Sequence, residues 1–335
     1  MENKKIILEE KTWNAKSFFF QWEWMLVVLL LLVHVFNGAV SPYYFSVDTF
    51  LSTPMSFLDQ AFIVFPMMLV LISGNGNIDI SVASIVALSS VIMGVSYNHG
   101  VPMSASIVLC FLTATLCGFI NGSILVKFPE LPAMIVTLST QILYRGVAYI
   151  ILENRAVGKF PSWFEYFGWG YVGPIPFIFL MFIICAVIYG IVIHKTSFGR
   201  SVYAVGNNRT AALYSGIKTN RLTLLIFTLT GFMSGFTALF LTSRMGSTRP
   251  NIASGYEMDI IAMAVLGGVS TDGGKGRIWG PVLAIFIIGY LEYGLGLLNQ
   301  SAQVVMIIIG ILLISSVLIQ DIHIFGKHRV LPGRK

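Results

Sequence analysis

The sequence predicts an all-α, polytopic membrane protein with about ten transmembrane segments, some of them broken or re-entrant helices. Composition is the first reason, because 56% of the 335 residues are hydrophobic and only 11% are charged. With a mean hydropathy of +0.81, such a chain cannot cover itself with a water-soluble surface. The second reason is spacing, because apolar runs close to the roughly 20 residues that cross a bilayer alternate with polar breaks.

Ten segments follow one another along the chain. Their approximate limits are 25–40, 57–74, 79–97, 104–126, 132–152, 174–194, 222–243, 259–271, 279–298 and 302–319. Residues 259–271 are too few to span a bilayer unaided, which predicts a broken or re-entrant helix. The small residues 37–41 after the first run resemble a signal-peptide cleavage site. Trp22 and Trp24 at the start of that run instead favour a retained membrane anchor.

The basic residues predict the orientation, because cytoplasmic loops collect Lys and Arg. With the N-terminus inside, 16 of the 21 cations fall on the cytoplasmic side. The exceptions are Arg145, Arg155, Lys159, Arg244 and Arg249. An even number of crossings returns the C-terminus to the cytoplasm. The net charge of +6 is therefore interpreted as an orientation signal, and no nucleic-acid partner is expected.

The stretch LISGNGNIDISVAS, residues 71–84, interrupts the apolar pattern between the second and third segments. Within a bilayer, such a break is tolerated only where it is buried in protein or lines a wet cavity. Asn77, Asp79 or Ser81 can cap the helix that begins here by accepting hydrogen bonds from its first amides. An acid inside a membrane is also a candidate for the solute path. Both roles are open for Asp79.

The polar segment 195–221 carries five cations and no acid. Asn207 or Asn208 can cap a short helix that contains Ala211 and Ala212, and Gly216 can end it. The two alanines would form a flat face that another protein can approach closely. The alternative is a plain connector with an incidental helix.

No catalytic, cofactor or metal site is expected in this chain, which is predicted not to be an enzyme. The stretch GGVSTDGGKG, Gly267–Gly276, resembles a phosphate-binding loop at first sight. A true loop needs a glycine where Val269 stands and a Ser or Thr after Lys275, where Gly276 stands. The histidines and cysteines show no ligand spacing. If transport uses ATP, a partner subunit must hydrolyse it.

Three stretches resemble the ribose-type permeases of bacterial ABC importers. FGRSVYAVGNNRTAALYSGI is similar to the cytoplasmic loop whose Ala-Ala-xxx-Gly core docks into the ATPase subunit. GNIDISVAS is similar to a Gly-Ile-Asp-Leu-Ser-Val-Gly segment, although the doubled Gly-Asn pair departs from the family pattern. EMDIIAMAVLGGVSTDGGKGRIWGPVLA resembles a Glu-Leu-xxx-Ile-Ala-Ala-xxx-Gly-Gly block. Because the three lie in order across most of the chain, we identify it as a member of this family.

The resemblance implies one transmembrane permease domain over residues 1–335, with a cytoplasmic N-terminal segment 1–21, a coupling loop 195–221 and a cytoplasmic tail 320–335. The protein would lie in the bacterial inner membrane with both termini in the cytoplasm. Two permease copies, or this chain and a paralogue, would enclose a path for a monosaccharide or similar small hydroxylated solute. Transport would proceed by alternating access. ATPase subunits holding ATP and Mg would dock inside, and a solute-binding protein would dock outside.

The resemblance also gives roles to candidate residues. The ATPase-coupling contact would involve Asn208, Ala211, Ala212 and Gly216, and candidates for the path or the broken helix are Asn77, Asp79, Ser81, Gln141 and Arg145. If the fifth segment is broken, Gln141 and Arg145 still share one face by their i, i+4 spacing. Arg145 can instead reach the outer interface or bond backbone carbonyls. Arg244, Arg249 and Glu257 would contact the binding protein through charge pairs, or else be solvated loop charges.

A self-contained proton- or sodium-coupled transporter is the alternative function. Its titrating carboxylate would be Asp79, Glu257, Asp259 or Glu292. This alternative predicts uphill uptake by the chain alone in vesicles with an ion gradient. The permease interpretation predicts no such uptake without the ATPase and the binding protein.

Overall fold

Long apolar runs form helices in this chain, because a helix satisfies its backbone hydrogen bonds within one segment, as a bilayer requires. The computed structural model describes residues 22–327; the predicted N-terminal segment 1–21 and residues 328–335 of the predicted tail lie outside the described residues. The longer helices are α2 (Trp22–Val40), α4 (Leu58–Ile72), α5 (Val82–Asn98), α6 (Met103–Lys127), α7 (Ala133–Leu152), α9 (Phe177–Lys195), α10 (Ser197–Asn207), α12 (Thr219–Met245), α13 (Tyr256–Leu266), α14 (Trp279–Leu297) and α15 (Ala302–Lys327).

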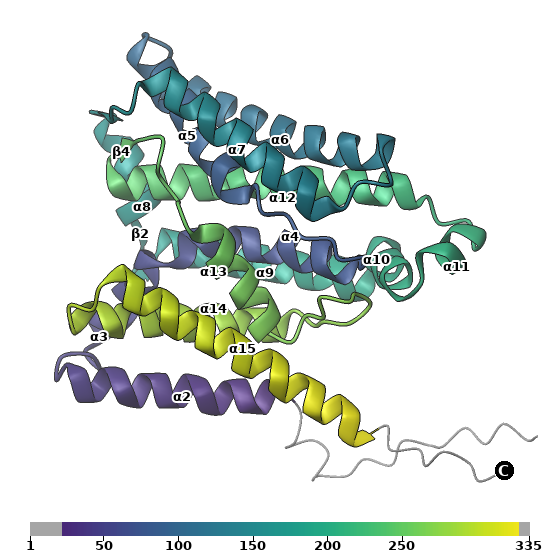
Figure 1. The fold of residues 1–335 in the computed structure, drawn as a ribbon. Coiled ribbons are helices and arrows are strands. Elements are labelled where there is room, and N and C mark those ends of the chain that lie inside the picture. The colour runs from purple at the N-terminus through teal and green to yellow at the C-terminus, as the bar shows by residue number, and fades with distance from the viewer. Residues whose placement is uncertain (1–21, 328–335) are drawn as a thin grey trace, which may run out of the picture.

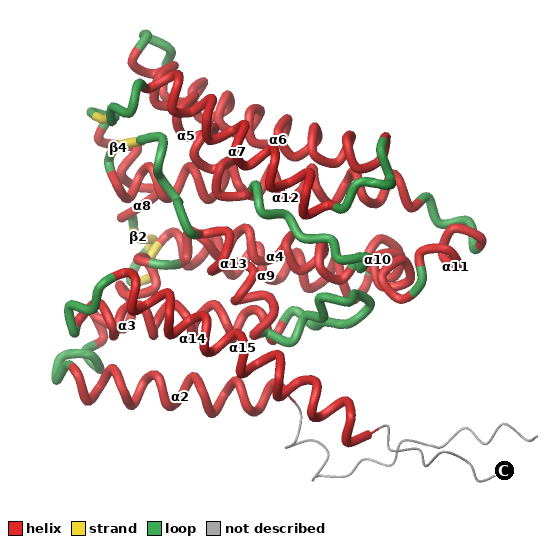
Figure 2. Tube along the Cα trace, viewed as in Figure 1, coloured by secondary structure: helices red, strands yellow, loops and turns green. Residues whose placement is uncertain are grey.

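Short elements connect these helices (Figure 2). The helical ones are α3 (Val47–Ser52), η1 (Thr53–Ser56), η2 (Ser162–Phe164), α8 (Glu165–Trp169) and α11 (Arg209–Tyr214). Two antiparallel strand pairs join β1 (Val157–Gly158) to β4 (Ser247–Thr248) and β2 (Tyr171–Val172) to β3 (Ile175–Pro176). The β1–β4 register places Val157 opposite Thr248, which brings together two loops that are far apart in sequence.

The predicted fold class is confirmed, because each of the ten predicted segments contains a helix. Within residues 22–327, six helices are long and apolar enough to cross a membrane, namely α2, α6, α7, α9, α12 and α14. A bent pair, Val47–Ser56 with Leu58–Ile72, adds a seventh candidate span with a 55° kink. Helix α5 and the Ala302–Ser316 part of α15 are shorter apolar helices. Helix α13 has only 11 residues, which agrees with the short segment predicted there.

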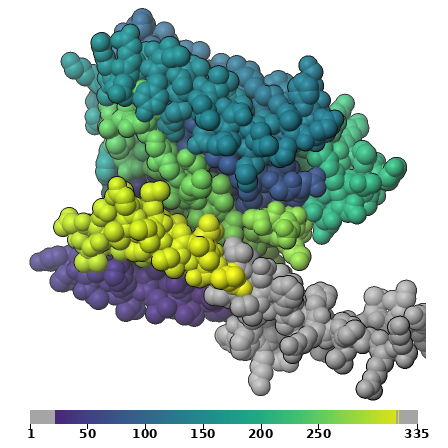
Figure 3. All heavy atoms as spheres, in the orientation of Figure 1, coloured from purple at the N-terminus to yellow at the C-terminus, as the bar shows by residue number. Residues whose placement is uncertain are grey.

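Helix α12 lies at the centre of the packing and contacts α4, α5 and α6. Glycines permit its closest approach to α6, since a Cβ added at Gly118 would come within 2.8 Å of the Cα of Gly231. On the other side, the ring of Phe62 in α4 stacks on Phe240 in α12 with centroids 4.9 Å apart. Helix α2 packs on α14, and Figure 3 shows α2 on the side opposite α6 and α7.

The two ends of the helix bundle differ in what they carry (Figure 1). One end holds α10 and α11, the beginning of α2 and the described end of α15. The other end holds α3, α8 and the short strand pairs. This separation places the 195–221 loop at the same end as the two ends of the described chain.

Candidate functional site

The break between α4 and α5 is formed by three consecutive residues in the left-handed backbone region. Gly74, Asn75 and Gly76 have φ angles of +73°, +59° and +67°, values that glycine and asparagine adopt more readily than other residues. The doubled Gly-Asn pair therefore supplies the residue types that this turn needs. Asn77 closes the end of α4, because its Nδ2 donates to the Oγ of Ser73 over 3.1 Å.

Asp79 lies just before the beginning of α5. Its side chain is fully buried, and its Oδ1 accepts the backbone N–H of Ser81 at 3.0 Å and the Ser81 hydroxyl at 2.6 Å. This arrangement satisfies an amide just before α5 begins at Val82. Asp79 thus bonds Ser81, the N-cap residue of α5, and Ser81 itself makes no side-chain capping bond. The bond expected from Asn77, Asp79 or Ser81 to the first amides inside the helix is therefore not formed, and Asp79 instead fixes the turn that precedes α5.

A buried chain of hydrogen bonds connects this turn to two other helices. The Asn121 amide of α6 donates to Ser81 Oγ at 2.8 Å, and the Tyr144 hydroxyl of α7 donates to Asn121 Oδ1 at 3.0 Å. Asp79 Oδ2 is buried without a hydrogen-bond partner among the described residues. In this conformation Asp79, Ser81 and Asn121 are all inaccessible, so they hold the break and do not face an open cavity.

Gln141 and Arg145 share one face of α7; Gln141 reaches the first turn of α13, and Arg145 reaches the segment that leads into it. Gln141 Nε2 donates to Glu257 Oε1 at 3.0 Å. The guanidinium of Arg145 donates to the carbonyl oxygens of Pro250 and Ile252 at 2.8 and 2.7 Å. Helix α7 runs unbroken from Ala133 to Leu152. The shared face is therefore present without a broken fifth segment, and Arg145 bonds carbonyls within the subunit.

Arg244 takes part in a buried ion pair. Its Nη2 lies 2.9 Å from Asp59 Oδ2, and only 17% of the Arg244 side chain is exposed, against none of Asp59. The hydroxyl of Tyr256 donates to the same carboxylate oxygen at 3.2 Å. These contacts join α4, the end of α12 and the beginning of α13. A buried carboxylate needs such a cation. Arg244 therefore neutralises Asp59 inside the helix bundle.

The three predicted contacts for a binding protein do not form one exposed surface. Arg249 is exposed, Glu257 is half-buried and bonded to Gln141, and Arg244 is held by Asp59. Of the three, Arg249 alone presents an exposed charge in this conformation. The sequence analysis did not identify Asp59. Its position as an acid at the start of the apolar run 57–74 could have indicated it.

The 195–221 segment contains two helices, α10 and α11. Asn208 caps α11, because its Oδ1 accepts the Ala211 N–H at 2.9 Å. Gly216 has a φ of +84°, and Ile217 N–H donates back to the carbonyl of Ala212 at 3.1 Å, which is the usual glycine-terminated helix end. Both helix limits agree with the roles predicted for Asn208 and Gly216.

The two alanines of α11 do not share a face. Ala212 is 4% exposed and packs against the chain, whereas Ala211 is exposed. Residues three or four apart line one side of a helix, and adjacent residues do not. The exposed apolar surface of α11 comes instead from Leu213 and from Tyr214, which is 87% exposed. The expected Ala-Ala face is thus absent, and the exposed apolar residues of α11 are Ala211 and Tyr214, three apart on one side, and Leu213 beside them.

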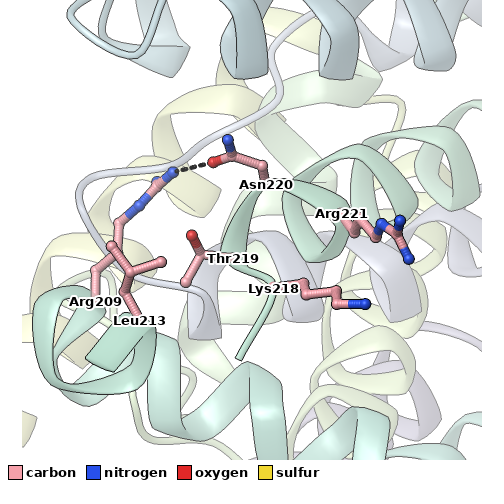
Figure 4. A pocket seen from close by; sticks show the side chains of 6 residues that line it. All are labelled: Arg209, Leu213, Lys218, Thr219, Asn220 and Arg221. Carbon is pink, nitrogen blue, oxygen red and sulfur yellow. Dashed lines mark hydrogen bonds between the residues drawn. The ribbon is translucent and has the colours of Figure 1, made fainter. Parts of the chain in front are cut away.

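A basic hollow of about 480 Å³ lies beside this surface, between α11 and the beginning of α12 (Figure 4). Its lining comprises Arg209, Leu213, Lys218, Thr219, Asn220 and Arg221. Three of these six residues are cations and none is an acid. Arg209 Nη2 donates to Asn220 Oδ1 at 3.4 Å across the hollow. The three cations do not converge in the hollow, because the side chains of Lys218 and Arg221 point away from Arg209 (Figure 4).

Comparison with known proteins assigns the chain to a family. Residues 52–317 match the family described as "Branched-chain amino acid transport system / permease component". The chain belongs to this permease family. Membership confirms the prediction of an ABC-type permease subunit and favours it over the self-contained ion-coupled transporter.

Curated relatives match the permease along most of its length. The "Autoinducer 2 import system permease protein LsrD" of Escherichia coli K12 is 33% identical over 300 residues, which cover 88% of this chain and 90% of the relative. The protein of the same name from Shigella flexneri matches equally well. Comparison with solved structures finds no match.

Apart from Arg244 and Arg249, the predicted site residues of the permease lie in three separate groups. Asn77, Asp79 and Ser81 hold the break, and Gln141, Arg145 and Glu257 connect α7 with α13. The coupling candidates occupy α11 at one end of the bundle. Asn121 and Tyr144 complete the first group, although neither was predicted as a path residue.

Proposed function

We propose that the chain is the permease subunit of a binding-protein-dependent ABC importer for a small hydroxylated solute of the furanose or monosaccharide type. The observation that carries the proposal is the 33% identity to LsrD over 88% of this chain, because LsrD is named as a permease of autoinducer 2 import. The family description names branched-chain amino acids, which makes such an amino acid the competing solute. A match over nearly the whole of both chains favours the LsrD-like solute.

The ATPase contact is assigned to α11 and the basic hollow. The exposed Leu213 and Tyr214 offer apolar contacts, and Arg209, Lys218 and Arg221 line the hollow beside Leu213. An aromatic anchor with a charged rim is a common arrangement in protein interfaces. ATP and Mg would bind to the ATPase partner, and two permeases, identical or paired with a paralogue, would enclose the path.

The orientation assigned to the chain is that of an inner-membrane protein with both termini in the cytoplasm. The Lys- and Arg-rich loops support it. So does the position of α10 and α11, at the same end of the bundle as the beginning of α2 and the described end of α15. The solute-binding protein would dock at the opposite end, where Arg249 is exposed.

Reconstituted vesicles test this function. The permease would be combined with the ATPase and the binding protein encoded nearest to it, and uptake of a labelled furanose signal, ribose and leucine would be measured. We expect ATP-dependent uptake of a sugar-like solute, no uptake by the permease alone with a proton or sodium gradient, and no uptake of leucine. Gradient-driven uptake by the chain alone would overturn the proposal, and uptake of leucine only would reject its solute class.

A further inference from the structure

Three backbone segments meet at glycines beside the break between α4 and α5. A Cβ added to Gly206, near the end of α10, would overlap the carbonyl oxygen of Ile72 and lie 2.6 Å from the amide nitrogen of Gly274. A Cβ added to Gly74 would lie 3.0 Å from the Cα of Gly206, and one added to Gly273 would overlap the Cα of Gly74. At these four positions, backbone contacts backbone directly.

Hydrogen bonds fasten the same three segments together. The N–H of Gly274 donates to the carbonyl of Ile72, the last residue of α4, at 2.9 Å. The hydroxyl of Tyr203 in α10 donates to the carbonyl of Gly276 at 2.6 Å. The loop that follows α13 is therefore bound on one side to α4 and on the other side to α10. We call Gly74, Gly206, Gly273 and Gly274, with these two bonds, the glycine junction.

The glycine junction explains why two stretches of the sequence are rich in glycine, the loop Gly267–Gly276 and the doubled Gly-Asn pair. The stretch Gly267–Gly276 fails as a phosphate-binding loop, yet its Gly273 and Gly274 have φ angles of +96° and +70°. A Cβ at Gly273 would overlap the backbone of Gly74, and one at Gly274 would meet the side chain of Asn207. Gly74 belongs to the doubled Gly-Asn pair and is equally confined. Glycine is required at these positions because the backbones approach so closely and, in the loop and the break, because of the left-handed conformation.

The glycine junction lies between the coupling helix α11 and the break before α5. Gly206 lies two residues before Asn208, which caps α11, so a displacement of α11 moves it directly. Gly74 lies five residues before Asp79, whose hydrogen bonds hold the beginning of α5 and lead to Asn121. Close-packed backbone has little room to deform, so displacement on one side is passed to the other.

We propose that the glycine junction transmits movement of the ATPase-bound loop to the break between α4 and α5, with Tyr203 and Gly206 as positioning residues for transport. This inference rests on the proposed function, in which segment 195–221 receives the ATPase. It goes further by naming the route inside the permease. Their proposed role requires no contact with the solute, because Tyr203 bonds the backbone of Gly276 and Gly206 lies against the backbone of Ile72 and Gly74.

Tyr203→Phe is the decisive variant, because it removes the bond to Gly276 without adding volume. Gly206→Ala adds one methyl group at the closest contact, and Gly310→Ala is the matched control, because its added methyl would meet open space. Full-length variants would be reconstituted with the ATPase and the binding protein. Three quantities would be measured: co-purification of the ATPase, ATP hydrolysis, and solute taken up per ATP hydrolysed.

We expect unchanged co-purification and hydrolysis for Tyr203→Phe, with uptake per ATP lowered about fivefold, the effect of losing one neutral hydrogen bond. Gly206→Ala should lower the same ratio further, and Gly310→Ala should leave it unchanged. A normal ratio in Tyr203→Phe would overturn the proposal, as would a loss confined to protein stability or ATPase association. Failure of the wild-type chain to bind the ATPase would instead reject the proposed function, so the two failures are distinguishable.

Discussion

Asp79 combines full burial with two hydrogen bonds from a single neighbour, Ser81. Asp79→Leu removes the acceptor and should lower the free energy of unfolding by about 1–3 kcal/mol, because the buried N–H of Ser81 loses its partner. Asp79→Asn keeps an oxygen acceptor and should retain stability and uptake. Thermal unfolding in detergent and uptake in vesicles would measure both effects. Normal stability and uptake of the Leu variant would contradict the hydrogen-bonding and path roles together, while a stable but inactive Asn variant would show that the charge itself is needed.

The sequence could predict that Asp79 forms hydrogen bonds just before α5, because such turns depend on residues a few positions apart. It could not predict the link from Ser81 to Asn121 and Tyr144, since those contacts join positions 40 and 23 residues apart through helix packing. Asp59 was missed for the same reason. An acid at the start of an apolar run looks like an interfacial residue until the cation that neutralises it is located on another helix.

Arg244 is expected to stabilise the fold more than any other predicted outer cation. Arg244→Met leaves the carboxylate of Asp59 buried without its ion-pair partner, which should lower the free energy of unfolding by about 3–5 kcal/mol. Arg249→Met is the control, because Arg249 is exposed and such changes usually stay within about 0.5 kcal/mol. Thermal unfolding of the two purified variants would compare them. Equal midpoints would contradict a stabilising role for the buried pair.

At the scale of single elements, α11 separates what local sequence determines from what it does not. Its limits follow from Asn208 and Gly216, whose side chain and backbone conformation act within one turn. The residues that α11 exposes do not follow from local sequence. Whether Ala211 or Ala212 is buried depends on how α11 packs against the rest of the chain. The same holds for α7, where the i, i+4 spacing of Gln141 and Arg145 predicted a shared face correctly but not its contacts with α13 and the segment before it.

Tyr214 is the residue of α11 most open to a partner. Tyr214→Glu should weaken ATPase association about tenfold or more without lowering thermal stability, because it removes an exposed aromatic anchor. Ala212→Glu should lower both, because Ala212 is buried within the permease itself. Tyr43→Glu, at a tyrosine that is 78% exposed, is the control and should bind the ATPase normally. Binding of the ATPase by Tyr214→Glu at wild-type strength would exclude this face as the contact.

At the scale of the whole molecule, hydrophobic run length predicted where each membrane helix lies, because crossing a bilayer requires a minimum of apolar residues. It did not predict the bend before α4 or the pairing of β1 with β4, since both arise from contacts between distant segments. The short α13 was predicted from its length alone. Its connection to α7 through Glu257 and Gln141 was not.

The assigned orientation predicts which side of the membrane each loop faces. Thr210 and Ser162 are both exposed and lie at opposite ends of the bundle, in α11 and η2. Thr210→Cys should react with an impermeant thiol reagent only from the cytoplasmic side, and Ser162→Cys only from outside. The native cysteines Cys110, Cys117 and Cys185 are buried and provide a low background in the unmodified chain. Labelling of both new cysteines from one side would contradict the orientation.

The ion pair between Asp59 and Arg244 also bears on how the protein is made. Its partners are 185 residues apart, so α4 leaves the ribosome and enters the bilayer long before α12 exists. Until α12 is inserted, the carboxylate of Asp59 has no cation beside it. It should then remain close to water or to the translocon, because burying an unpaired carboxylate in lipid is energetically unfavourable. A chain ending at Lys195 should therefore be degraded faster in a pulse-chase experiment than the same fragment with Asp59→Asn. Equal lifetimes would mean that the early helices are stable without α12. A longer lifetime of the Asp59→Asn fragment would mean that α4 becomes fully stable only when the seventh predicted segment, which contains α12, has been inserted.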